Sequence, residues 1–120
     1  MNWFLIVVAA LHACFMLGEL LPWEAPLVLQ KVSEKLPKGE PFTRCQQKLV
    51  ATIVHNAGIY NGIVAGGLFW AAFAGAAATD VARVLLIGAT VAGVFGTLTL
   101  KSPLTALQAI AGIIGLLLLK

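Results

Sequence analysis

Four long apolar runs dominate this sequence and constrain its fold more than any other feature. They cover residues 3–21, 49–73, 81–100 and 103–119, and they contain only two charged side chains, Glu19 and Arg83. A membrane-spanning helix needs about 20 apolar residues, with about 17–25 accepted. Because lipid offers no partners to backbone amides, each run should be helical. The sequence predicts an all-α integral membrane protein, a four-transmembrane-helix antiparallel bundle that forms one domain over residues 1–120.

The composition supports a membrane protein and argues against other classes. The chain is 60% hydrophobic and 11% charged, whereas soluble domains are about 45–50% apolar and about 25% charged. Five of the eight Lys and Arg residues fall in one loop, so the net charge of +3 does not indicate a nucleic-acid partner. Cys14 lies in an apolar run and Cys45 in a polar loop, so we expect free thiols. No metal-ligand spacing is visible, and we expect no cofactor.

Helix-capping and helix-breaking residues between the runs predict where the helices begin and end. Pro22 should close the first helix, and Asp80 should cap the third. Ser102 and Pro103 should start the fourth, with proline at the first helical position. Little more than Lys101 and Ser102 separates the last two runs, which predicts an antiparallel hairpin.

The long connection, residues 22–48, carries both an amphipathic pattern and the charge asymmetry. One helical stripe of this connection is apolar and consists of Val28, Leu29, Val32 and Leu36. We therefore expect a short amphipathic helix on the membrane surface. The alternative is an irregular solvated loop. Six basic residues, five of them in this loop, lie on one side of the membrane, and two lie on the other side. The positive-inside rule therefore predicts a cytoplasmic loop 22–48 with both termini outside.

Polar side chains within the runs are the candidate functional residues, because burial in hydrocarbon is costly without a partner. At a rise of about 1.5 Å per residue, they gather in the half of the membrane nearer the long loop. We predict that they form a pocket open to the cytoplasm. The alternative for each is a structural bond between helices. The predicted ligand-binding residues are His12, Glu19, Asn56, Tyr60, Asn61 and Gln108.

Glu19 has the most specific expectation. It lies seven residues after His12, on the same helix face, at a predicted depth near that of Asn56. We expect its carboxylate to face the bundle and bond to a polar side chain of another helix. The competing arrangement has Glu19 pointing outward beside Trp23, near water and lipid headgroups.

Small residues predict close helix packing. Gly58, Gly62 and Gly66 repeat every four residues, as do Gly88, Ala92 and Gly96, and Gly112 follows Gln108 at the same spacing. Such stripes let backbones approach closely, in a tight bundle or in a dimer.

Three stretches resemble a family of small bacterial membrane proteins known as domain of unknown function 1304. The first is His12-Ala13-Cys14-Phe15-Met16-Leu17-Gly18-Glu19, followed by Trp23. The most specific is Asn56-Ala57-Gly58-Ile59-Tyr60-Asn61-Gly62, and the last is Gly93-Val94-Phe95-Gly96-Thr97-Leu98-Thr99 with Gln108. The resemblance implies a multi-pass protein with four helices in the bacterial inner membrane, of unassigned activity.

Three functions are compatible with these observations. The first is binding of a small or lipid-like ligand in the polar pocket, with or without its translocation. Because four helices leave little room for a pathway, translocation would need a homodimer. The second is an intramembrane acid–base enzyme, such as an isomerase acting on a lipidic substrate with Glu19 and His12. The third is a structural or accessory membrane subunit in which the polar residues only fix helix packing.

Overall fold

The structure, a computed structural model, describes residues 1–22 and 43–119. All regular structure in these residues is helical, as predicted. The predicted surface helix and Trp23 lie outside the described residues. The elements are α1 (Trp3–Glu19), α3 (Arg44–Ala74), the short 3-10 helix η1 (Gly75–Ala78), α4 (Thr79–Leu100) and α5 (Pro103–Leu118).

Helix α3 begins five residues before its predicted start at residue 49, so residues 44–48 are helical and not part of the loop. The reason is a capping box. The backbone N–H of Gln46 donates to the Thr43 side chain, and the Thr43 N–H donates to the Gln46 side chain at 2.8 Å. Two free amides of the first turn are thereby satisfied. The apolar run marks the apolar part of the helix, whereas the cap marks its beginning.

The other helix ends agree with the sequence in part. Ser102 caps α5 as predicted, because its hydroxyl accepts from the N–H of Leu104. Asp80 is not a cap: α4 begins at Thr79, and Asp80 lies in its first turn, paired with Arg83 at 2.6 Å. A carboxylate in the first turn still interacts favourably with the helix dipole.

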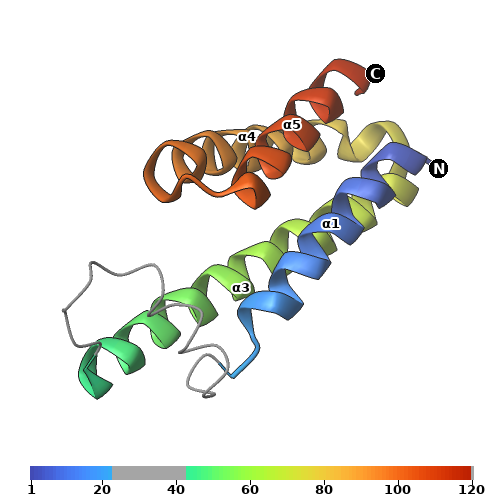
Figure 1. Cartoon of the computed structure of the whole chain (residues 1–120). Coiled ribbons are helices and arrows are strands. Elements are labelled where there is room, and N and C mark those ends of the chain that lie inside the picture. The colour runs from blue at the N-terminus through green and yellow to red at the C-terminus, as the bar shows by residue number, and fades with distance from the viewer. Residues whose placement is uncertain (23–42, 120) are drawn as a thin grey trace.

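The helices form two antiparallel pairs, α1 with α3 and α4 with α5 (Figure 1). The pairs meet at the end that holds the N-terminus and diverge toward the other end. Large buried side chains from three helices join the pairs there: Leu5, Leu68 and Leu86. Between α3 and α4 the chain turns at Gly75, whose φ of 69° favours glycine.

Close helix approach occurs at some of the small residues and not at others. A Cβ at Gly62 would lie 2.7 Å from the sulfur of Met16, and one at Gly93 would lie 2.8 Å from the Ala109 Cα. Gly66 and Gly88 have open space where a Cβ would be. The predicted tight packing is therefore present within each pair, but not along every stripe.

By length and composition, one helical run of the described chain, residues 44–100, is long and apolar enough to cross a membrane. It comprises α3, η1 and α4. Helices α1 and α5 are apolar but have only 17 and 16 residues, a rise of about 26 and 24 Å. This is less than the hydrocarbon thickness of about 30 Å. The four-span bundle consequently stays a prediction.

Candidate functional site

Three of the predicted site residues form a hydrogen-bonded chain between α1 and α3. The side-chain nitrogen Nδ2 of Asn61 donates to Oε2 of Glu19 at 2.6 Å. On its other side, Oδ1 of Asn61 lies 2.8 Å from Nδ1 of His12. Glu19 thus turns toward another helix and bonds to a polar side chain, as predicted. One asparagine links a histidine and a carboxylate that are seven residues apart on α1.

The donors in this chain assign the histidine tautomer. Because the carboxylate accepts, the Asn61 amide must present its NH₂ group to Glu19 and its carbonyl oxygen to His12. Nδ1 of His12 must therefore carry a proton and donate. The ring is fully buried and makes a T-shaped contact with the ring of Phe15, with centroids 5.8 Å apart. Its Nε2 has no hydrogen-bond partner in the part of the chain that the structure describes.

Helix geometry brings the three side chains together. Leu5, His12 and Glu19 recur at seven-residue intervals, so they share one stripe of α1. Gly58 and Gly62 let α1 approach α3 along this stripe, since a Cβ at Gly58 would lie 3.1 Å from the Glu19 Cβ. Glycines on one helix thus place the polar groups of the other within bonding distance.

The pairing with Asn61 fixes the level of Glu19 along α3. Glu19 was expected at a depth near that of Asn56, and it lies beside Gly58, two residues further along α3, and bonds to Asn61. The end of α1 therefore lies fourteen residues into α3, which begins at Arg44 and extends about 21 Å past it. Because the two helices do not end together, a depth counted from the loop along α1 differs from one counted along α3.

The six predicted residues do not assemble into one pocket. Asn56 and Tyr60 are exposed on a different face of α3 from Asn61, and the Tyr60 side chain is 70% exposed. Gln108 is half-buried on α5. None of these three makes a side-chain hydrogen bond within residues 1–22 and 43–119. A helix turns by about 100° per residue, so neighbours in sequence such as Tyr60 and Asn61 point apart.

Two further polar contacts between different segments of the chain were not predicted from the sequence. Nε2 of His55 lies 3.1 Å from the carbonyl oxygen of Leu21, to which it must donate. The Thr97 hydroxyl contacts the Thr105 hydroxyl at 3.3 Å, between α4 and α5. The polar residues are visible in the sequence, but backbone acceptors and rotamers are not.

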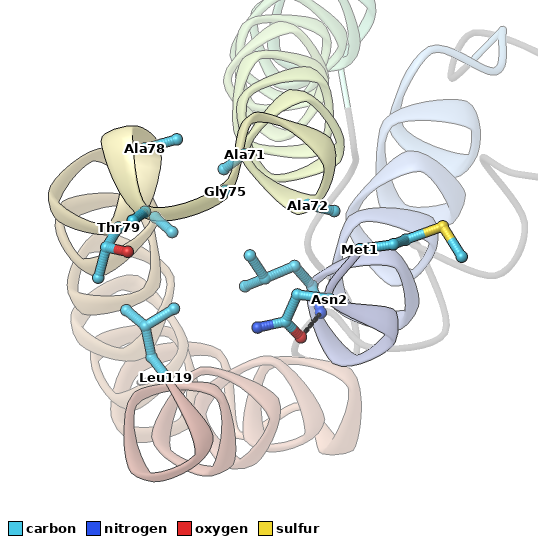
Figure 2. Close-up of a pocket in the computed structure, with 11 residues that line it drawn as sticks. Met1, Asn2, Ala71, Ala72, Gly75, Ala78, Thr79 and Leu119 are labelled. Carbon is cyan, nitrogen blue, oxygen red and sulfur yellow. Dashed lines mark hydrogen bonds between the residues drawn. The ribbon is translucent and has the colours of Figure 1, made fainter.

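A cavity of about 270 Å³ lies at the opposite end of the molecule from Glu19. Figure 2 shows its lining, which comes from the start of α1, the α3–α4 connection and the end of α5. Its lining residues are mostly small and apolar, with Asn2 and Thr79 as the polar side chains. The Asn2 side chain already accepts the backbone N–H of Phe4. Without a charged side chain in its wall, this cavity is a poorer candidate site than the polar chain.

The polar chain offers a positioned carboxylate to the outside. Oε2 of Glu19 is taken by Asn61, whereas Oε1 accepts no hydrogen bond within the described residues. The Glu19 side chain is half-buried, so part of it is open to a ligand. In the described ranges, no group of three or more His, Cys, Asp or Glu side chains could hold a metal ion. The arrangement is suited to accept a hydrogen bond or balance a positive charge.

Comparison with known proteins places the chain in a family. The family model described as "Protein of unknown function (DUF1304)" matches residues 6–120. The chain belongs to this family. A curated relative, "Uncharacterized protein YpaA" of Lactococcus lactis subsp. lactis (strain IL1403), is 32% identical over 72 residues. That match spans 60% of each chain. No solved structure gives a significant match. The DUF1304 assignment confirms the predicted resemblance, and the function of the family is unknown.

Proposed function

We propose that this DUF1304 protein is a multi-pass protein of the bacterial cytoplasmic membrane with four spanning helices. The distribution of large and small residues supports the proposal. Among the described residues, the buried apolar side chains are mostly alanine, while Phe95, Leu98 and Leu117 are 68%, 73% and 79% exposed. Soluble proteins rarely expose so much contiguous apolar surface, and membrane helices pack through small residues. The apolar Leu20, Leu21 and Leu119 flank α1 and α5 and add to their span.

The described charges support an orientation with the long loop in the cytoplasm. The start of α3, which holds Arg44 and Lys48, and the α4–α5 connection, which holds Lys101, lie at the end where the two helix pairs diverge (Figure 1). The start of α4, which holds the Asp80–Arg83 pair, lies at the other end, near the N-terminus (Figure 1). Basic residues concentrate on the cytoplasmic side of membrane proteins.

Thiol labelling tests this topology. In a Cys14→Ser background, we expect a membrane-impermeant maleimide to leave Cys45 unlabelled in intact cells and to label it after permeabilisation. Cys45 is exposed, so access to its thiol depends on the side of the membrane. Labelling in intact cells would reverse the orientation, and recovery of the chain in the soluble fraction would contradict the membrane assignment.

We further propose that the site binds a small or lipid-like ligand that carries a cationic hydrogen-bond donor. The observation that carries this proposal is the chain from His12 through Asn61 to Glu19, with distances of 2.8 and 2.6 Å. It fixes one carboxylate oxygen and leaves the other free. A side chain that is already held in one rotamer loses less conformational entropy when a ligand binds, so the fixed Glu19 carboxylate is preorganised for binding.

The same geometry favours binding over acid–base chemistry. An isomerase would need both the imidazole and the carboxylate within reach of its substrate. His12 is fully buried and donates to Asn61, so its part is to orient the amide. We therefore assign it a positioning role and assign the ligand contact to Glu19.

Two amphiphiles of opposite charge test the ligand class. We expect purified protein in neutral detergent to bind decylammonium about tenfold or more tighter than decyl sulfate, because a charge-assisted hydrogen bond contributes about 1.5–3 kcal/mol. Glu19→Gln, whose amide oxygen can still accept from Asn61, should abolish the preference. Asp80→Asn, which removes a carboxylate that is 90% exposed at the other end, should retain it.

Native mass spectrometry or isothermal titration would give the two affinities. Equal binding of both amphiphiles to the unaltered protein would contradict the proposal. So would a Glu19→Gln variant that keeps the full preference for the ammonium.

A further inference from the structure

An exposed face of α3 presents two polar side chains that have no hydrogen-bond partner in the part of the chain that the structure describes. Asn56 and Tyr60 lie one turn apart, both exposed and without side-chain hydrogen bonds within the described residues. The neighbouring His55, whose Nε2 lies 3.1 Å from the Leu21 carbonyl oxygen, places Asn56 level with the end of α1, and Tyr60 lies four residues or about 6 Å further along α3. If α1 spans the membrane as proposed, Asn56 lies near the edge of the hydrocarbon and Tyr60 lies within it, where lipid chains offer the phenol no partner.

These two residues belong to a regular seam. Ile53, Asn56, Tyr60 and Ile63 follow one another at intervals of three, four and three residues, the spacing of side chains that pack between two helices. All four are exposed, with Ile53 at 58% and Ile63 at 60%. The next position of the seam is Gly67, where a Cβ would lie 2.6 Å from a methyl carbon of Leu85 on α4. The chain's own α4 thus covers the seam at one end only.

Helix α4 would be a poor cover for the rest of the seam. It runs antiparallel to α3 and diverges from it beyond this contact (Figure 1). Continuing the Gly67–Leu85 register places Ala92 opposite Tyr60 and Gly96 opposite Asn56. Neither residue has a side-chain hydrogen-bonding group. Closing the α4–α5 hairpin onto α3 would therefore leave the amide and the phenol unpaired.

A second copy of the chain supplies what α4 lacks. The asparagine amide is both donor and acceptor, so two copies related by a twofold axis can pair Asn56 with Asn56. Amides that bond across helices stabilise association within membranes. We propose that the seam formed by Ile53, Asn56, Tyr60 and Ile63 is the contact surface of a homodimer, with Asn56 at its hydrogen-bonded centre.

Cysteine cross-linking in membrane vesicles tests this interface. In a Cys14→Ser/Cys45→Ser background, Ile63→Cys should give a covalent dimer on oxidation. Val91→Cys on α4, where the side chain is 62% exposed against 60% for Ile63, is the matched control and should stay monomeric. Adding Asn56→Leu to Ile63→Cys should weaken dimerisation about 5- to 30-fold, the range expected for one interhelical amide bond in a membrane.

If lipid or the chain's own hairpin covers the seam instead of a second copy, the labelling and cross-linking results differ. A maleimide that labels Ile63→Cys freely, with no covalent dimer, would mean that lipid covers the seam and would overturn the proposal. Protection of Ile63→Cys without a dimer would mean that the chain's own hairpin closes over it, with the same consequence. Equal cross-linking at Val91→Cys would show random collision. These results are independent of Glu19, so they separate the dimer from the ligand site.

Discussion

Replacing Gly93 with alanine should lower the free energy of unfolding by about 1–3 kcal/mol, the usual cost of overpacking. The added Cβ would meet the backbone of α5: it would contact the Ala109 nitrogen and lie 2.8 Å from both the Ala109 Cα and the Thr105 carbonyl oxygen. Backbone atoms cannot rotate away as a side chain can. The α4–α5 hairpin would have to separate to accept one methyl group.

Gly88→Ala is the matched control on the same helix. No atom lies within 4 Å of a Cβ at Gly88, and alanine is a better helix former by about 0.5–1 kcal/mol. Its stability should be unchanged or slightly raised. Unfolding in mixed micelles with increasing dodecyl sulfate, followed by far-UV circular dichroism, gives both values. Equal destabilisation by the two substitutions would mean that α4 and α5 do not pack at Gly93.

The sequence predicts the helical elements well because hydrophobic run length is a strong signal. It misplaces the start of α3 because residues 44–48 are polar, although Thr43 and Gln46 form a capping box that could have been recognised by their spacing. It also misassigns the cap of α4, since an acidic residue suits the first turn as well as the cap position. Local hydrogen bonds determine helix ends, and composition does not.

The candidate site is predicted in part. The seven-residue spacing of His12 and Glu19 identifies their common face correctly. Their partner Asn61 could be selected as polar, but the offset between α1 and α3 depends on packing at Gly58 and Gly62. The sequence grouped Asn56 and Tyr60 with Asn61 by depth alone, without the rotation of α3 that turns them away.

Asn61→Leu should break the polar chain and destabilise the protein by about 1–3 kcal/mol, since it leaves the buried N–H of His12 and an oxygen of Glu19 unpaired. Leucine is similar in volume, so little of the loss comes from packing. Asn56→Leu makes the same chemical change at an exposed position without a hydrogen bond, and in monomeric micelles it should stay within about 0.5 kcal/mol. The same unfolding assay compares them. Equal stability of the two variants would contradict the structural role of Asn61.

The ring nitrogens of the two histidines test the polar chain most directly. The hydrogen bonds require His12 to donate from Nδ1 to Asn61, and His55 to donate from Nε2 to the Leu21 carbonyl. Nitrogen-15 magnetic resonance of the protein in lipid bilayers, with His55→Gln for assignment, should therefore find a protonated Nδ1 in His12 and a protonated Nε2 in His55. Asn61→Leu should remove the Nδ1 preference of His12 and leave His55 unchanged. An unprotonated Nδ1 in His12, or a ring that does not respond to Asn61→Leu, would contradict the chain that positions Glu19.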